Sequence, residues 1–379
     1  MPGDRATRCW VEVSLGRIGA NFDHVRGVVG KAVEVVPVVK ANACGHGAVP
    51  VARALCARGA RWLAVSSVEE GVALRAAKID ARILVMAGFL PVERTALIDF
   101  DLTPVLHSLP AIREWDHLNR VRGRTAAYHL KIDTGLWRLG TLAVASEIAA
   151  AVSACSHAQL EGLMTHFASA GDYSCTQTEE QTSRFLGIAA ELASVGVSLT
   201  YRHLSGTVPV AYGRARAWQN MVRTAHAIYG YIAPSSGPEA PAPVLRVEPA
   251  LSWKVRILEV KDVPAGAAIG YRGTFRAPAP MRIAILAAGY ADGIPHQLAN
   301  RGQVIAAGRI TPMLGAIAMD LTAVDVTHAP GLQPGDAVTL LGSEGCVALD
   351  AQQIGQAAGT SSYAILCGIG ARVRRVYVE

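Results

Sequence analysis

The chain has 379 residues, of which 51% are hydrophobic and 17% charged, so a disordered chain is excluded and two folded domains are expected. Its net charge of +6 is scattered without interleaved aromatic residues, which speaks against nucleic-acid binding. No apolar run reaches the roughly 18 residues of a membrane span, and the seven cysteines include no Cys-x-x-Cys pair, so we expect a cytoplasmic protein without disulfides or a metal site.

The first elements lead to a lysine. Residues 9–14 predict a strand, and apolar residues at helical spacing follow Ser14. Residues 34–39 form an apolar, β-branched run that is typical of a parallel strand buried on both faces, and Lys40 comes directly after it. A desolvated ammonium would make Lys40 an imine-forming nucleophile, whereas a solvated strand-end lysine is the alternative.

Short apolar runs then alternate with alanine-rich helical stretches. The predicted strands are 34–39, 62–66, 82–86, 103–106, 127–132, 160–165, 199–204 and 220–223. This α/β alternation predicts a closed parallel TIM-type (β/α)8 barrel, whose sites lie at the C-terminal ends of its strands. The ends of these strands carry Lys40, Lys131, His166, Ser205 and Arg223.

The pattern changes after a stretch rich in proline and glycine at residues 233–243, which predicts a linker. Short runs in which apolar and polar residues alternate follow. The first lies around Val255 and Ile257, and similar short runs lie at 282–287, 303–306, 321–326 and 337–341. We therefore expect a barrel domain at 1–243 and a mainly β domain at 244–379, to which residues 9–14 could add a strand.

Several blocks occur in one order along nearly the whole chain. They are Val38–Gly47 around Lys40, Lys131–Gly140, Met164–Ala168, Val222-Arg223, Gly270–Phe275, Ala288–Gly293, Gly315–Asp320 and Ser362-Tyr363. In order and spacing this set resembles the alanine racemases, which are barrel-type pyridoxal-phosphate enzymes. The resemblance implies a pyridoxal 5'-phosphate cofactor and a small amino-acid substrate.

The resemblance also implies two bases. The cofactor supplies the electron sink that allows the α-proton to leave. Lys40 would hold the cofactor and act as the base on one face, and Tyr271 of the partner subunit would act on the other. Phenols ionise near pH 10, so Tyr271 needs a proton acceptor, for which His166 is the candidate. The alternative for His166 is a core histidine bonded to a backbone carbonyl.

Three cationic residues take further roles from the resemblance. Arg223 would face the pyridine nitrogen and leave it unprotonated, which favours proton return over transamination. Arg138 would steady the phenol oxygen of the cofactor and the substrate carboxylate. Lys131 would carry a carbamate that holds Arg138. The alternative for Lys131 and Arg138 is an ion pair with Asp133.

The remaining implied residues bind substrate or phosphate. The Met319 N–H of the partner subunit and Tyr290 would lie at the substrate, so the active unit would be a homodimer with shared active sites. The phosphate would lie near the last barrel strands. Its ligands would be Ser205, Gly206, Ala225, His226 and Tyr363. The alternatives are a simple turn for Ser205-Gly206 and a packed core tyrosine for Tyr363.

Some positions depart from the family pattern. Cys44 replaces a phosphate-binding tyrosine, Leu204 an asparagine and Ala225 a glycine, so we expect weaker cofactor retention. At the expected substrate entrance His296 and Ala316 replace arginines, and Gly171 is inserted. A pocket discriminates one methylene by only about 1 to 3 kcal/mol, so preference for alanine does not follow from the resemblance alone.

Four functions are compatible with these residues. The leading one is a racemase that interconverts L- and D-alanine by two-base proton transfer. The others are a racemase for serine or other amino acids, a barrel-type pyridoxal-phosphate decarboxylase or aldolase, and a homologue that binds the cofactor without catalysis. Two bases on opposite faces are best explained by racemisation.

Overall fold

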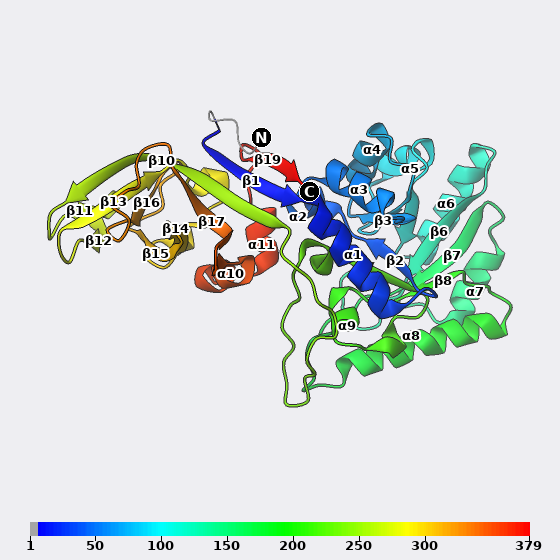
Figure 1. The fold of residues 1–379 in the computed structure, drawn as a ribbon. Helices are drawn as coiled ribbons and strands as arrows, with labels where there is room; N and C mark the ends of the chain where they lie inside the picture. Colours follow the sequence, from blue (N-terminus) through cyan, green and yellow to red (C-terminus); the bar gives the residue numbers. More distant parts are fainter. Residues whose placement is uncertain (1–6) are drawn as a thin grey trace. The chain divides into compact units, whose positions relative to one another are not determined.

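The computed structural model describes residues 7–379, which form two compact units (Figure 1). One unit comprises Arg17–Ala43 and Ala48–Glu248, and the other comprises residues 7–16, Cys44–Gly47 and Pro249–Glu379. The stretch 233–243 contains no helix or strand and belongs to the first unit. The division by contacts therefore falls between Glu248 and Pro249, beyond the stretch that the sequence indicates as a linker.

Parallel strands close into a barrel in the first unit. Within residues 7–379, six of them form a sheet in the order β3-β4-β5-β6-β7-β8, and β2 pairs with β9. The bridge between Val38 and Ala64 joins the end of β2 to β3, while Arg223 N–H donates to Ser205 O at 2.9 Å between β9 and the end of β8. The predicted (β/α)8 barrel is confirmed. Its strands are β2 (Glu34–Pro37), β3 (Trp62–Val65), β4 (Arg82–Val85), β5 (Thr103–Leu106), β6 (Ala126–Lys131), β7 (Ala158–Met164), β8 (Tyr201–His203) and β9 (Met221–Thr224).

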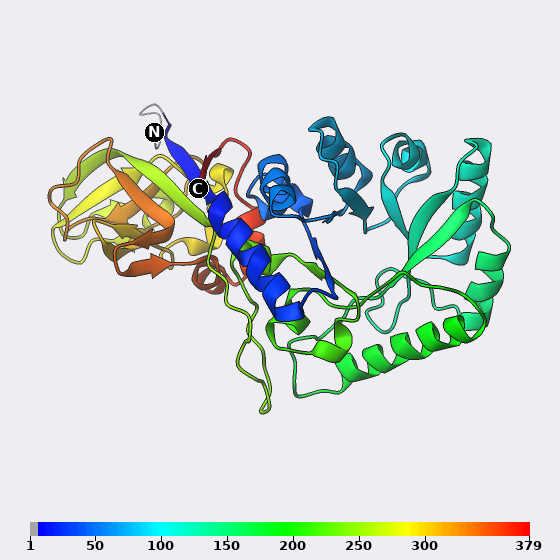
Figure 2. The same ribbon diagram turned by 45° about the vertical axis from the view of Figure 1, so that its right-hand side comes forward.

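Helices lie on the outside of this barrel (Figures 1 and 2). The sequence determines α6 clearly, because the Ser108 hydroxyl caps its first turn and its buried face carries Ile112 and Trp115. None of the helices in the described residues has the length and hydropathy that a membrane crossing requires. The longer helices are α1 (Leu15–Val29), α3 (Ala48–Ala57), α4 (Val68–Ala76), α5 (Arg94–Asp99), α6 (Leu109–Val121), α7 (Ala145–Ser153) and α8 (Gln177–Ser194), with a short α9 (Thr207–Ala211).

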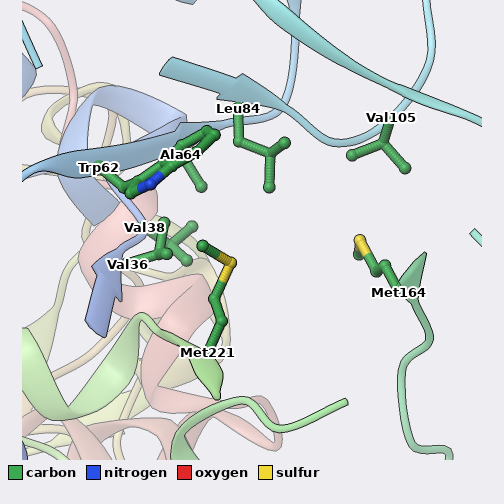
Figure 3. Packing of buried hydrophobic residues seen from close by; sticks show 8 residues of the cluster. All are labelled: Val36, Val38, Trp62, Ala64, Leu84, Val105, Met164 and Met221. Carbon is green, nitrogen blue, oxygen red and sulfur yellow. The ribbon is translucent and has the colours of Figure 1, made fainter. Parts of the chain in front are cut away.

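The barrel interior is filled with apolar side chains from alternate strand positions. Figure 3 shows these side chains converging from β2, β3, β4, β5, β7 and β9. Because side chains at i and i+2 share a face of a strand, a residue two positions further along the same extended strand also points toward the barrel axis. The cluster consists of Val36, Val38, Trp62, Ala64, Leu84, Val105, Met164 and Met221.

The second unit is built on one mixed sheet. Its strand order is β18-β17-β14-β15-β16-β13-β10-β1-β19, and a further pairing of β17 with β10 closes part of it. The strand β1 (Cys9–Ser14) pairs antiparallel with β10 and parallel with β19. The other strands are β10 (Leu251–Val263), β13 (Met281–Leu286), β14 (Gln303–Ala306), β15 (Arg309–Leu314), β16 (Thr322–Asp325), β17 (Ala337–Glu344), β18 (Val347–Leu349) and β19 (Arg374–Val378), with the small pair β11 (Ala268–Ile269) and β12 (Phe275–Arg276). Two helices, α10 (Ala351–Ala358) and α11 (Ser362–Cys367), complete the unit.

Candidate active site

The polar side chains at the barrel mouth continue the interior rows of the strands. Arg223 follows Met221 by two positions, and His166 follows Met164 in the same way. The charges of Arg223, Lys131, Arg138 and Lys40 all act on the His166 imidazole. The structure therefore brings together five of the residues singled out in the sequence, at the C-terminal ends of the strands.

Lys40 stands at the start of an unusual turn. The next three residues, Ala41, Asn42 and Ala43, have φ of 52–55° and ψ of 45–50°, which is the left-handed helical region. Cys44 follows with a φ of 49°. For alanine this conformation costs roughly 1 to 2 kcal/mol per residue, and such strain is concentrated at functional sites. The surrounding structure must hold this segment, labelled α2 (Lys40–Cys44), in place.

Hydrogen bonds hold the turn at several points. Ala43 N–H donates to Val39 O at 2.9 Å, and the Asn42 side-chain oxygen accepts from Ala48 N–H at 2.8 Å. Ala41 N–H donates to the carboxylate of Glu70 at 2.6 Å. We expected the Lys40 amine to be desolvated. In a single subunit this expectation is wrong, because Lys40 is exposed to solvent. The strand before it is buried, but Lys40 itself lies past the last residue of that strand.

Arg223 is 4% exposed, and both of its terminal nitrogens, Nη1 and Nη2, donate hydrogen bonds to other residues of the protein. Its Nη1 donates to Nδ1 and to the carbonyl of His203, at 2.7 and 2.8 Å. Its Nη2 lies 2.8 Å from Thr165 O, 3.1 Å from Leu204 O and 3.4 Å from His166 Nδ1. Burial lowers the pKa of Arg223 to about 9, which leaves the guanidinium charged at neutral pH. Its Nε–H has no hydrogen-bond partner in residues 7–379 and remains available as a donor.

Two fully buried histidines extend this network through the barrel interior. His203 Nε2 lies 2.7 Å from His129 Nδ1, and His129 Nε2 lies 3.4 Å from the Glu161 carboxylate. Burial lowers the pKa of both histidines, so both are neutral. Since Arg223 donates to His203 Nδ1, the proton of His203 is on Nε2 and points to His129. Arg82 closes the network by donating twice to Glu161, at 2.7 Å each.

These two histidines were missed in the sequence, although a signal was present. His129 precedes Lys131 by two positions, and His203 precedes Ser205 in the same way. Strand periodicity therefore places each of them on the face that carries a predicted site residue. Glu70 was also missed. The pattern Ser67-Val-Glu-Glu70 predicts a capping box, but no local pattern reveals that Glu70 also reaches the turn after Lys40.

Lys131, Asp133 and Arg138 do not form the ion pair that was the alternative reading. The Asp133 carboxylate instead accepts the N–H groups of residues 135–138 at 2.9 to 3.2 Å. Burial acts to raise the pKa of Asp133, but these backbone bonds hold it below its usual value. Among the described residues no ion pair joins Asp133 to Lys131 or Arg138.

The side chains of Lys131 and Arg138 differ in burial. Lys131 is 3% exposed, and burial together with Arg138 and Arg223 lowers its pKa to about 8. A substantial fraction of the amine is therefore neutral near pH 8. Arg138 is exposed, and its guanidinium makes no hydrogen bond or ion pair to any residue in the described part of the chain. Arg138 is thus available to a ligand.

Four of the predicted phosphate ligands, Ser205, Gly206, Ala225 and His226, lie in the loops that follow β8 and β9. Gly206 N–H has no hydrogen-bond partner within residues 7–379, and a Cβ at Gly206 would lie 3.6 Å from both Arg223 O and His166 Cε1. The Ser205 hydroxyl donates to Ala217 O at 2.7 Å but can still accept. Ala225 N–H is already engaged by Thr207 Oγ1 at 3.2 Å. His226, also buried, follows in the same loop.

Two of the departures from the family pattern, Cys44 and Leu204, are buried. Cys44 is 2% exposed and Leu204 is fully buried, so neither presents the polar group that the family pattern would place there. The cradle for an anion therefore depends on fewer side-chain donors than the pattern predicts. This supports the expectation of weaker cofactor retention.

The remaining candidates lie in the second unit and are exposed. Tyr271 is 72% exposed and Met319 is 53% exposed, and Tyr290 is also exposed. Neighbouring turns carry them, because Tyr290 N–H donates to Ala318 O at 3.0 Å and a Cβ at Gly270 would lie 3.3 Å from Ala316 N. The Met319 N–H makes no hydrogen bond within the described chain. Tyr363 in α11 is 38% exposed, so it is not a packed core tyrosine.

An arginine fixes two of these turns. Arg372 donates to the Asp292 carboxylate at 2.7 and 2.9 Å and to Asp320 at 2.7 Å. Asp292 lies two residues after Tyr290, and Asp320 lies one residue after Met319. One guanidinium therefore links the two turns. The backbone that carries Tyr290 and Met319 is therefore held in place by these ion pairs, although both side chains are exposed.

The fold and site together define a parallel-barrel protein with a lysine, a histidine and a buried arginine at one mouth, joined to a mainly β unit. Residues 13–233 match the model for the N-terminal domain of alanine racemase, and residues 250–377 match that for its C-terminal domain. The alanine racemase of Halothermothrix orenii is 36% identical over 98% of both chains.

Solved structures agree with these matches. The alanine racemase structure from D-cycloserine-producing Streptomyces lavendulae has a TM-score of 0.90 at 34% identity, over 98% of this chain and 97% of that one. That from Bartonella henselae, with covalently bound pyridoxal phosphate, has a TM-score of 0.87 at 25% identity, over 98% and 100%. The chain belongs to the alanine racemase family.

Proposed function

We propose that the protein is a pyridoxal 5'-phosphate-dependent alanine racemase, an isomerase that interconverts L- and D-alanine. The observation that carries this proposal is the donor pattern of Arg223. Every Nη hydrogen of this buried arginine is used by the protein, while its Nε–H has no partner in the described residues and is available at the mouth. A cationic donor suits the unprotonated nitrogen of an aromatic ring such as pyridine.

The residues at the mouth fit this cofactor. Lys40 would hold it covalently and Arg223 would face its ring nitrogen. The phosphate would lie against Gly206, whose N–H is unpaired in the described chain, and against Ser205. By resemblance Ala225, His226 and Tyr363 complete the proposed phosphate site, in which a phosphate oxygen would share the Ala225 N–H with Thr207 Oγ1. When bound, pyridoxal phosphate supplies the electron sink that makes the α-proton of an amino acid removable.

Two bases exchange that proton. The amine of Lys40 removes or returns it on one face of the substrate, and the phenol of Tyr271 of the partner subunit does so on the other. His166 has its pKa lowered to about 3 by burial and by the charges of Arg223, Lys131, Arg138 and Lys40. It is therefore a neutral imidazole that can accept a hydrogen bond from the phenol and orient it, but it stores an extra proton poorly. The sequence suggested that His166 accepts the proton of Tyr271, and the low pKa narrows that role to orienting the phenol.

The substrate carboxylate would be held by two groups. The free guanidinium of Arg138 supplies one contact, and the Met319 N–H of the partner subunit supplies the other. Tyr290 would lie beside them. The exposure of Tyr271 and Met319 supports a homodimer with shared sites, because large side chains with apolar surface that are exposed on one subunit are typical of residues covered by a partner. The seven cysteines are odd in number and widely spaced in the sequence, which supports a cytoplasmic location.

Lys131 is proposed to carry a carbamate that steadies Arg138. Burial and the neighbouring Arg138 and Arg223 lower the pKa of Lys131 to about 8, so its neutral amine can add carbon dioxide and release a proton. The carbamate would place a negative charge near the Arg138 guanidinium. Mass spectrometry under native conditions with 13C-labelled bicarbonate would detect it.

The free amine of Lys131 predicts a pH dependence of stability. Because its pKa is lowered from 10.5 to about 8, the unfolded chain binds the proton more tightly between these values. Without carbon dioxide, the free energy of unfolding of the wild type relative to Lys131→Met should rise between pH 8 and 10.5, by at most about 3 kcal/mol. Urea titrations measure this. Added bicarbonate should make the difference in free energy of unfolding between the two proteins less dependent on pH. A difference that does not change with pH in the absence of carbon dioxide would contradict the prediction.

The proposed activity is tested in deuterium oxide. Holoenzyme incubated with L-alanine should form D-alanine, and deuterium should enter the α-position of both enantiomers; chiral chromatography with mass spectrometry measures both. A parallel panel with serine and larger amino acids defines the specificity. Release of carbon dioxide would indicate a decarboxylase, and bound cofactor without exchange on any amino acid would indicate a non-catalytic homologue.

A further inference from the structure

The Glu70 carboxylate accepts hydrogen bonds beyond the one that its helix cap requires. It is the third residue of α4, and its Oε2 accepts the N–H groups of Ser66 and Ser67 at 2.7 and 3.3 Å. The bond from Ser67 N–H belongs to the capping box, which Ser67 Oγ completes by accepting Glu70 N–H at 3.3 Å, whereas Ser66 lies one residue before the cap. The other oxygen, Oε1, accepts Ala41 N–H at 2.6 Å. One carboxylate thus joins the start of α4 to the residue directly after Lys40.

We propose that Glu70 is a positioning residue for Lys40, whose carboxylate fixes the left-handed turn that presents the lysine amine to the cofactor and substrate. This inference rests on the proposed role of Lys40. Glu70 itself is not placed in contact with either ligand.

The strain in the turn explains why such a bond is needed. Ala41 is the first residue of the left-handed run, with φ of 52° and ψ of 50°. A bond from its N–H to a carboxylate is charge-assisted and roughly twice as strong as a neutral one. It therefore acts at the position where the chain leaves the extended strand, which is adjacent to Lys40.

Two other helix N-termini show that capping the N-cap N–H does not need both carboxylate oxygens. In α7 the Glu147 carboxylate accepts Val144 N–H at 3.0 Å and makes no contact with the lysine turn. In α10 the same place is taken by Gln353, whose single amide oxygen accepts Asp350 N–H at 2.8 Å. Glutamine is therefore sufficient for capping. A glutamine at position 70 would have to turn its NH2 group toward one of the N–H donors. It would then lose either the hydrogen bond from Ser67 N–H or the one from Ala41 N–H.

The test compares Glu70→Gln with the matched control Glu147→Gln. Hydrogen exchange, read by mass spectrometry on peptides covering residues 40–47, should become about ten- to a hundredfold faster for the Ala41 amide in Glu70→Gln and stay unchanged in Glu147→Gln. The dissociation constant of pyridoxal phosphate and kcat/KM for alanine should both worsen about tenfold or more in Glu70→Gln only, with kcat affected more than KM.

Each outcome decides the proposal. It is overturned if both variants lose similar thermal stability while exchange at Ala41 and cofactor binding match the wild type, because Glu70 is then only a cap. It is also overturned if exchange at Ala41 accelerates while cofactor binding and kcat are unaffected. The wild type provides a measurement that needs no variant: its Ala41 amide should be strongly protected, and rapid exchange there would refute the inference. A wild type without racemase activity refutes the proposed function instead, and leaves the exchange measurement interpretable.

Discussion

Subunits carrying Lys40→Ala and subunits carrying Tyr271→Phe are each expected to lose racemase activity by about 10³-fold or more, since each lacks a proton-transferring group. Mixing them should restore activity. Lys40 lies at the barrel mouth of one unit, and Tyr271 is 72% exposed on the other. If each site combines Lys40 of one subunit with Tyr271 of the partner subunit, a mixed dimer has one intact site and one that lacks both groups. Random exchange of subunits should then recover about a quarter of the wild-type activity.

The measurement is racemase activity after brief unfolding and refolding of the two proteins together. Each protein refolded alone is the control. Unmixed Lys40→Ala with undiminished activity would refute the assignment of Lys40. Mixtures that stay inactive, although sedimentation shows that dimers form, would refute the sharing of sites between subunits and leave the role of Lys40 open.

The sequence predicts the barrel well because the strands of a parallel sheet are buried on both faces. Runs such as residues 34–39 are therefore continuous and apolar, and they stand out against the helices that alternate with them. The strand β15 was missed because its alternation is interrupted by Pro312, which can pair with Gln303 in the sheet although proline usually ends a strand. The strand β19 begins with two arginines and also gave no apolar signal.

The candidate site was predictable where its residues stand alone at strand ends. Lys40, Lys131, His166 and Arg223 are polar groups that directly follow or end buried runs. The left-handed turn after Lys40 could not be predicted, because alanine and cysteine are poor residues for positive φ and the conformation depends on contacts from Glu70 and Ala48. The bond to Glu70 joins segments that are 29 residues apart in the sequence.

The orientation of Arg223 was likewise beyond prediction. A strand-end arginine in a sequence suggests a solvated cation or an anion site. The structure shows that its Nη groups are consumed by His203, Thr165 and Leu204, and that only the Nε–H is left without a partner in residues 7–379. Burial and a fixed set of acceptors thus convert a flexible cation into an oriented donor.

This orientation predicts that Arg223→Lys is not a conservative change. Lysine has three donors on a flexible chain and cannot match a planar set of acceptors that includes His203 Nδ1 and the carbonyls of Thr165 and Leu204. Lost bonds from a buried charged group cost about 1.5 to 3 kcal/mol each, so the free energy of unfolding should fall by about 3 kcal/mol or more. The affinity for pyridoxal phosphate should also weaken, and kcat/KM should fall about a hundredfold, because an oriented donor is lost at the ring nitrogen.

Arg82→Lys is the matched control for this prediction. Arg82 also makes a bidentate bond, to Glu161, and its guanidinium lies 3.9 Å from the centre of the Trp62 ring. It belongs to the same network but lies at the start of β4, whereas Arg223 lies near the end of β9. Arg82→Lys should therefore lose stability while its cofactor affinity and kcat stay near those of the wild type. Equal losses of stability in the two variants, with unchanged cofactor affinity and kcat in both, would show that Arg223 supports the fold and does not orient the cofactor.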